Sequence, residues 1–253
     1  MLSKNEIKYI QSLSHKKFRQ EHGFFIAEGP KLFNELWTRK PTWLERLYAT
    51  KSYWDQLTKE LQQSLQHAYM PVEDFELSKI SMLQTPQELL AVVKIPSEHS
   101  EAAIAEIDQA NNWMLALDNI QDPGNMGTLI RTAHWFGIHQ IVCGHGCVDV
   151  YSPKVVQASM GSIFATNILY ADLSDFFQQK KLPVYGALLH GEPLGKINPS
   201  KKGIILIGNE GHGISETLIS QIDHPVTIPG HSDAESLNAA MAAGILMYAF
   251  TNG

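Results

Sequence analysis

Residues 113–144 read WMLALDNIQDPGNMGTLIRTAHWFGIHQIVCG and predict a strand, a helix and a second strand. The runs 113–118 and 140–144 are apolar on both faces, and a helical pattern covers 127–136 between them. Strands that are apolar on both faces and alternate with helices are typical of a buried, mainly parallel sheet. This stretch therefore predicts the strand–helix–strand unit from which α/β folds are built.

The sequence after this stretch repeats the same alternation and ends in a predicted helix over 235–250 that is rich in very small residues. The further predicted strands cover 166–170, 184–189, 203–208 and 225–229, and the further predicted helices cover 153–160, 174–180 and 215–221. Ligands of such sheets bind outside the carboxyl ends of the strands. We therefore expect the functional residues in the loops that follow the strands.

The first 96 residues predict a second, smaller α/β domain. Its predicted helices cover 3–20, 30–37, 52–65 and 72–80, and its predicted strands cover 24–29, 44–49, 67–70 and 88–94. Residues 97–112 are polar and rich in Glu and Ala, which predicts a linker. We expect one domain over 1–96, a linker over 97–112 and the larger domain over 113–253.

The composition excludes several classes of protein. A chain of 253 residues that is 44% hydrophobic and 18% charged is neither disordered nor a coiled coil. Its two cysteines are too few for a disulfide framework, which favours a cytoplasmic protein. The start of the chain has no signal-peptide core, and the longest mostly apolar run is about twelve residues, too short to span a membrane.

The net charge of −6 argues against a nucleic-acid partner, but the charge is unevenly distributed. Residues 1–50 carry nine Lys and Arg against five Asp and Glu. Five of these cations lie near the start of the chain: Lys4, Lys8, Lys16, Lys17 and Arg19. They are interpreted either as an RNA-contact surface or as the solvated face of a helix.

Three loops after predicted strands carry most of the chemical information. The first, LDNIQDPGNMGTLIR over 117–131, places Asn125 before a predicted helix start near Gly127 and Arg131 within that helix. The second, LIGNEGHGIS over 206–215, is rich in glycine but does not match the dinucleotide fingerprint. The third, IPGHSDAESLNAAMAAG over 228–244, has Ser236 and Asn238 as expected helix caps.

Together the three loops resemble the signature motifs of the SpoU/TrmH family of RNA ribose 2′-O-methyltransferases, in the SPOUT superfamily. DNIQDPGNMGTLIRTAHWFG, LIGNEGHGIS and IPGHSDAESLNAAMAAG occur in the family's order, and we name them motif one, motif two and motif three. The segments FIAEGPKLFNEL and TPQELLAVVK resemble the small substrate-binding domain that is often fused to this family, which has the fold of some ribosomal proteins.

The resemblance implies a parallel-sheet domain with a deep trefoil knot, a homodimer and S-adenosylmethionine as cofactor. The loops of motifs two and three would hold this cofactor. The cofactor-binding residues that it implies are Leu206, Gly208, Gly211, Ile228 and Leu237. No metal is needed, because the sulfonium is already an activated methyl donor.

The residue roles are also implied by the resemblance. Arg131 corresponds to the motif-one arginine of the family, which either activates the ribose hydroxyl or binds the neighbouring phosphate and stabilises the developing alkoxide. Asn125 and Glu210 would orient Arg131 and the motif loops. Ser236 and Asn238 would hold the ribose and the motif-three loop.

Three further expectations concern the metal, the substrate and the alternative function. Cys143, His145 and Cys147 do not match common zinc spacing, so we predict no metal site. The added N-terminal domain favours ribosomal RNA over transfer RNA as substrate. The alternative is a non-catalytic RNA-binding or ribosome-assembly factor of the same fold.

Motif three departs from the family at Gly230 and in the longer polar loop that follows, 231–233.

Overall fold

The computed structural model describes residues 1–96, 113–179, 181–230 and 235–252. It divides into two compact units, and the first contains Met1–Ser97 together with Asp149–Phe164. The second contains Glu98–Val148 and Ala165–Gly253. The predicted linker 97–112 and the polar loop 231–233 lie outside the described residues.

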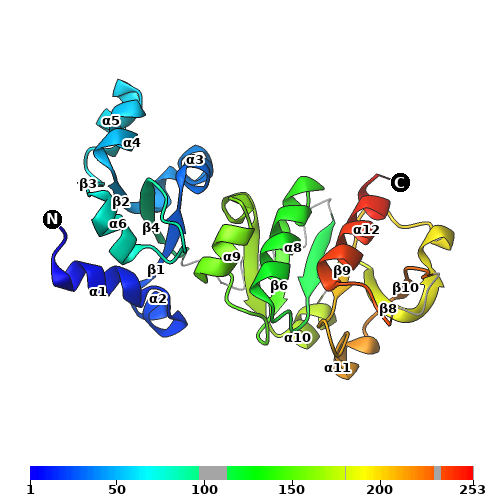
Figure 1. The fold of residues 1–253 in the computed structure, drawn as a ribbon. Coiled ribbons are helices and arrows are strands. Elements are labelled where there is room, and N and C mark those ends of the chain that lie inside the picture. The colour runs from blue at the N-terminus through cyan, green and yellow to red at the C-terminus, as the bar shows by residue number, and fades with distance from the viewer. Residues whose placement is uncertain (97–112, 180, 231–234, 253) are drawn as a thin grey trace. The chain divides into compact units, whose positions relative to one another are not determined.

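The first unit contains a four-stranded sheet with the strand order β1-β4-β2-β3 (Figure 1). In this sheet β2 and β3 are parallel, and the other neighbours are antiparallel. The strands are β1 (Phe24–Glu28), β2 (Leu44–Ala49), β3 (Tyr69–Pro71) and β4 (Leu89–Lys94). The helices are α1 (Lys4–Ser12), α2 (Lys16–His22), α3 (Pro30–Arg39), α4 (Lys51–Gln56), α5 (Lys59–Leu65), α6 (Asp74–Ile80), α9 (Pro153–Ala158) and the 3-10 turns η1 (Pro41–Trp43) and η2 (Ser162–Phe164).

Both faces of this sheet are covered. Ile10 of α1 and Leu77 of α6 pack in one hydrophobic cluster with Ile26 of β1. Phe25, the neighbour of Ile26 along β1, points to the opposite face because side chains alternate along a strand. Its ring lies 4.9 Å from that of Tyr151 and 6.3 Å from that of Phe164, both in the 149–164 segment. This segment is therefore one of the layers of the first unit.

The single helix that we expected over 3–20 is two helices. Ser3 caps α1, since its Oγ accepts a hydrogen bond from the Glu6 N–H at 3.1 Å. The chain turns after Ser12, and Arg19 of α2 donates hydrogen bonds to two carbonyls in this turn. Arg19 is only 2% exposed, so its place in an exposed basic surface is wrong, whereas Lys16 and Lys17 are exposed.

The helix expected over 52–65 is likewise divided into α4 and α5. Leu57 ends α4, and Thr58 begins a new helix by accepting a hydrogen bond on Oγ1 from the Leu61 N–H at 3.3 Å. A threonine in this position satisfies a backbone donor that a continuous helix would have bonded internally. The break is thus a local capping effect, which helical periodicity alone does not reveal.

The second unit contains a six-stranded sheet whose neighbours are all parallel, as the apolar strands predicted. The strand order is β10-β8-β9-β5-β6-β7. The strands are β5 (Met114–Leu117), β6 (Gln140–Gly144), β7 (Asn167–Ala171), β8 (Val184–Pro193), β9 (Ile204–Ile207) and β10 (His224–Thr227). The helices are α8 (Pro123–Trp135), α10 (Leu173–Gln178), α11 (Glu216–Ile219), α12 (Ala239–Thr251) and the 3-10 turn η3 (Leu194–Lys196).

Helices α8 and α12 lie side by side in this unit (Figure 1). Phe250 of α12 stacks on Trp113 at the start of the sheet, with 4.9 Å between ring centroids. A hydrophobic core cluster forms between the strands and the helices α10 and α11. It includes Leu173 and Phe177 of α10 and Leu218 of α11. Among the described residues, no helix combines the length and apolar character that a membrane crossing requires. The trefoil knot stays a prediction.

Candidate functional site

The loops of motifs one and two leave the six-stranded sheet next to each other. Leu117 at the end of β5 pairs with Ile207 at the end of the parallel strand β9. Just beyond the strands, Asp118 accepts a hydrogen bond on Oδ2 from the Ser215 N–H at 2.7 Å. Asn209 donates from Nδ2 to the carbonyl of Asn119 at 2.8 Å. The two loops are therefore tied together at both ends of motif two.

Asn125 lies inside the first turn of α8, so the prediction that the helix starts near Gly127 is wrong. Asp122 caps the helix by accepting a hydrogen bond on Oδ1 from the Asn125 N–H at 2.7 Å. Pro123 then occupies the first helical position, where its missing N–H costs nothing and its fixed φ suits a helix. The cap and the proline together start α8 earlier than the apolar pattern indicated.

One side chain joins all three motifs. Asn125 of motif one donates from Nδ2 to Oε1 of Glu210 in motif two at 2.8 Å. Its Oδ1 accepts a hydrogen bond from Nδ2 of Asn238 in motif three at 2.9 Å. Asn238 also caps α12, since its Oδ1 accepts from the N–H groups of Ala240 and Met241. The expectation that Asn238 caps the last helix is confirmed.

The glycine-rich loop of motif two is a tight turn. Asn209 and Gly213 exchange backbone hydrogen bonds of 2.9 Å in both directions. The Asn209 side chain accepts hydrogen bonds on Oδ1 from the N–H groups of Gly211 and His212. A Cβ on Gly208 would lie 2.2 Å from the carbonyl carbon of Gly213. Because that contact is with backbone, only glycine fits at position 208.

Arg131 lies about two turns further along α8 and does not join the Asn125–Glu210–Asn238 network. Its side chain is exposed and has no hydrogen-bond or ion-pair partner among the described residues. Trp135, four residues on and therefore on the same face of α8, is 83% exposed. The guanidinium is thus available to a ligand or to another chain.

The remaining residues predicted at the site have different surroundings. Ser236 is exposed and precedes the actual cap of α12, so its expected capping role is wrong because the helix starts at Ala239. Leu237 is 52% exposed, although it is apolar. Ile228 is half-buried after the end of β10, and Gly211 is exposed. Leu206 is buried within β9 in the core cluster, so its side chain does not line the loops.

Three residues that hold the site together were missed by reasoning from the sequence: Asp118, Asp122 and Asn209. The signal for Asp122 was present, since an Asp directly before Pro-Gly is a typical helix cap. The signal for Asn209 was its place in a glycine-rich turn, because asparagine side chains in turns commonly form a hydrogen bond with the backbone two residues further along the chain. The bond between Asp118 and the Ser215 N–H depends on strand order and had no local signal.

The two cysteines are buried free thiols, and Cys143 lies in β6 as expected. Hydrogen bonding to Cys147 and burial raise the pKa of the Cys143 thiol. Cys147 accepts a hydrogen bond on Sγ from the Ile120 N–H at 3.3 Å and donates to the Leu117 carbonyl at 3.2 Å. Across the described ranges, no group of three His, Cys, Asp or Glu side chains could hold a metal ion.

Comparison with known proteins places the chain in the family that the three motifs resemble. Residues 112–248 match the SpoU rRNA Methylase family, and residues 4–91 match the MRM3-like substrate binding domain. The chain is 32% identical over 251 residues to the 23S rRNA (guanosine(2553)-2'-O)-methyltransferase RlmP of Bacillus subtilis. This alignment covers 97% of this chain and 96% of that protein.

Solved structures are similar over the whole chain. An AdoMet-bound rRNA methyltransferase from Sinorhizobium meliloti has a TM-score of 0.87 and 28% identity, covering 100% of this chain and 97% of that one. A TrmH-family protein from Porphyromonas gingivalis has a TM-score of 0.86 and 35% identity, covering 99% of this chain and 98% of that one. The chain therefore belongs to the SpoU rRNA methylase family, as its three motifs predicted.

Proposed function

We propose that this protein transfers a methyl group from S-adenosylmethionine to a ribose 2′-hydroxyl of RNA, with ribosomal RNA as the substrate. The observation that carries this proposal is the side chain of Asn125, which joins motif two through Glu210 and motif three through Asn238. The relative from Bacillus subtilis is named as a methyltransferase of 23S rRNA, which favours ribosomal over transfer RNA. These features favour an enzyme over a non-catalytic binding factor.

The residues of motifs two and three fit S-adenosylmethionine. The backbone at Gly211 and Gly230 is open, since a Cβ would meet only the Asn209 side chain at 3.6 Å at the first and nothing within 4 Å at the second. Leu237 exposes an apolar side chain in motif three. We assign the cofactor to Gly208, Gly211, Ile228 and Leu237, with Leu206 supporting them from the core. When bound, the sulfonium supplies an activated methyl group.

Arg131 is assigned to the RNA rather than to proton removal. A guanidinium stays protonated in proteins and is therefore a poor base. It binds phosphate oxygens through two parallel hydrogen bonds and stabilises negative charge that develops nearby. Arg131, which is exposed and has no side-chain partner in the part of the chain that the structure describes, would hold the phosphate beside the target ribose and lower the energy of the alkoxide. In this proposal Asn125 and Glu210 keep the motif loops in register, and we assign Ser236 and Asn238 to the ribose.

A homodimer is part of the proposal, because α8 and α12 expose a group of large apolar side chains. Trp135 is 83% exposed, and Met241, Ile245 and Tyr248 of α12 are 62%, 36% and 63% exposed. Apolar groups gathered in this way commonly mark a protein–protein interface. Since Arg131 shares the face of α8 that carries Trp135, each Arg131 would lie close to the partner subunit.

The domain assignment follows the same logic. We propose that residues 1–96 bind the RNA substrate, that 97–112 connect the domains and that 113–253 form a SPOUT methyltransferase domain with a trefoil knot. The match of residues 4–91 to a substrate-binding domain supports the first assignment. The two free, buried thiols support a cytoplasmic location, where cysteines stay reduced.

Replacement of Arg131 tests the proposed function. Calorimetry should detect S-adenosylmethionine binding to the wild-type protein, and rRNA from cells that lack the protein should accept labelled methyl groups. Arg131→Ala should lose turnover on the order of 10²-fold, as for other groups that stabilise developing charge, while cofactor affinity is retained. Arg131→Lys should be intermediate because it keeps the charge without the paired donors.

The exposed Lys196, in the same unit, offers a matched control through Lys196→Ala. Near-normal turnover in Arg131→Ala would remove Arg131 from the mechanism. Failure of the wild-type protein to bind S-adenosylmethionine would favour the non-catalytic alternative.

A further inference from the structure

A small cavity opens at the carboxyl edge of the six-stranded sheet. Its volume is about 220 Å³, and its walls come from the segments that follow β5, β6 and β7 and from the start of α11. The described residues that line it include none of those assigned to the cofactor. Since ligand pockets commonly enclose about 300–1,000 Å³, this cavity suits a single small ring system rather than S-adenosylmethionine.

A buried carboxylate lines this cavity. Asp118 is only 8% exposed, and its Oδ2 accepts a hydrogen bond from the Ser215 N–H at 2.7 Å. Its Oδ1 has no hydrogen-bond partner in the described part of the chain. A buried acceptor without a partner carries a desolvation cost, which a ligand that offers an N–H group removes. The cavity therefore suits a ligand that donates hydrogen bonds.

The other lining side chains suit a flat ring without negative charge. Leu173 and Leu218 are buried and give the cavity an apolar surface. His145 also lines it, is exposed, and has no hydrogen-bond or ion-pair partner among the described residues. Histidine rings stack on bases of single-stranded RNA, and the base edges are read by hydrogen bonds. None of the described lining residues is Lys or Arg, which argues against a phosphate ligand.

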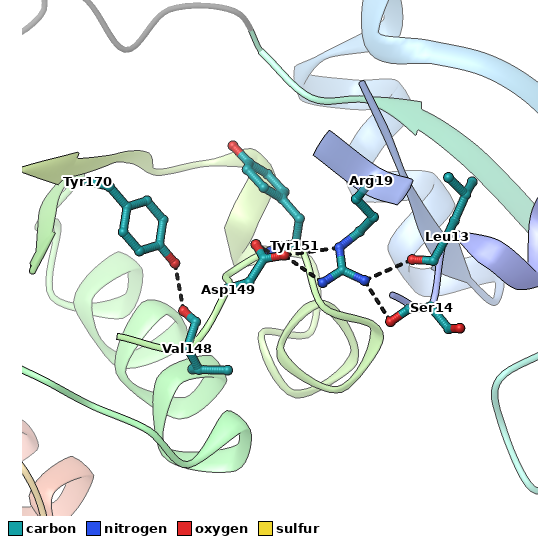
Figure 2. Close-up of polar contacts among 7 residues, drawn as sticks. All are labelled: Leu13, Ser14, Arg19, Val148, Asp149, Tyr151 and Tyr170. Atoms are coloured by element: carbon teal, nitrogen blue, oxygen red, sulfur yellow. Dashed lines mark hydrogen bonds and ion pairs between the residues drawn. The ribbon is translucent and has the colours of Figure 1, made fainter. Parts of the chain in front are cut away.

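The loop after β6, which forms one wall, is held in place by hydrogen bonds. The Cys147 N–H donates to the Gly144 carbonyl at 2.9 Å and closes a turn. Val148 donates from its N–H to the carbonyl of Ile120 at 2.8 Å, and its own carbonyl accepts from the Tyr170 hydroxyl at 2.6 Å (Figure 2). A cavity whose walls are fixed beforehand loses little conformational entropy when a ligand binds.

The cavity adjoins the network that joins the three motifs. Asn119, another of its lining residues, has a left-handed backbone conformation with a φ of 58°. Its carbonyl accepts a hydrogen bond from Nδ2 of Asn209 at 2.8 Å. Asn209 directly precedes Glu210, the motif-two partner of Asn125. A ligand in the cavity would therefore lie at the same edge of the sheet as the motif network.

We propose that this cavity binds a nucleobase of the substrate RNA, from an unpaired nucleotide close to the methylated ribose. Asp118 accepts a hydrogen bond from an N–H group on the edge of the base, and His145 stacks on its ring. The cavity thus contributes to the choice of RNA and takes no part in binding the cofactor. This inference rests on the proposed function.

Two variants and one control test the cavity in the full-length protein. His145→Ala removes the stacking ring from an exposed position, and Asp118→Asn replaces a carboxylate oxygen by an amide donor of similar shape. His139→Ala is the matched control, because this exposed histidine lies at the opposite end of β6. The kcat and KM for RNA are measured with rRNA from cells that lack the protein. Active sites are counted by calorimetric titration with S-adenosylmethionine.

His145→Ala should raise the KM for RNA by about fivefold or more, because that is the lower end of the effect of losing base stacking. Asp118→Asn should raise it by about tenfold, as expected for a lost hydrogen bond to a charged group. His139→Ala should resemble the wild type. Unchanged KM in both cavity variants would overturn the inference. So would a loss of activity in His145→Ala that matches a loss of cofactor-binding sites, because the residue would then support the fold.

Mononucleotides test the class of ligand without methyl transfer. The NMR signal of the His145 ring, assigned by its absence in His145→Ala, is followed in saturating S-adenosylmethionine while GMP, AMP, CMP or UMP is added. At least one of them should shift this signal in a saturable way, and ribose 5-phosphate should not. No shift with any mononucleotide, or an equal shift with ribose 5-phosphate, would overturn the inference. A wild-type protein that shows the shift but methylates no rRNA would instead refute the proposed methyl transfer.

Discussion

Replacing Asn125 by Asp changes the central side chain of the motif network with almost no change in shape. Asn125 donates to Glu210 through Nδ2 at 2.8 Å and accepts from Asn238 through Oδ1 at 2.9 Å. An aspartate at this position keeps the second bond but has no donor for the first. It also places a second carboxylate beside that of Glu210, so motifs one and two would repel each other.

The expected loss of activity in Asn125→Asp can be calculated from the hydrogen bond between Asn125 and Glu210. A hydrogen bond to a charged acceptor contributes about 1.5–3 kcal/mol, and the exposure of Glu210 favours the lower value of about 1.5 kcal/mol. Two unit charges at this 2.8 Å separation repel by about 1.5 kcal/mol at the dielectric constant of water. Rotation of the side chains relieves part of this repulsion. We therefore expect kcat/KM to fall by about 10- to 100-fold.

The assay is methyl transfer to rRNA at limiting substrate, with active sites counted by cofactor titration. Gln121→Glu is the matched control, since it makes the same amide-to-carboxylate change on an exposed residue of the same loop. In the Asn125→Asp background, Glu210→Gln should recover part of the lost activity, because the new amide can donate to the aspartate. If Asn125→Asp matches Gln121→Glu in kcat/KM, the network does not organise the site.

Two further predictions concern stability and the motif-two turn. Burial raises the pKa of the Glu28 carboxyl above its usual 4.5, so its contribution to stability is present at low pH and is lost as pH rises through the raised pKa. The free energy of unfolding of Glu28→Gln minus that of the wild type should therefore increase as the pH rises. Urea denaturation at several pH values measures both free energies. If their difference does not change with pH, the prediction is wrong. Gly208→Ala should abolish S-adenosylmethionine binding in calorimetry, because its Cβ collides with backbone, whereas Gly195→Ala, with nothing within 4 Å, should bind normally.

Much of the fold was predictable because it is encoded locally. Apolar runs that are buried on both faces predicted the parallel sheet, and the strands β5, β6 and β9 lie where those runs do. Helix boundaries were less predictable, since caps such as Asp122 and Thr58 start helices independently of the apolar period. The three motifs identified the family because each is a continuous stretch of chain.

The sequence by itself determined the α/β class, the family and the residue types at the site, since all three depend on neighbours along the chain. Only the tertiary structure decided which of those residues meet. It placed Asn125 between Glu210 and Asn238, left Arg131 outside that network and buried Arg19 against Asp149. The physical reason is that strand order and packing, rather than local propensity, bring together side chains that are 85 to 130 residues apart.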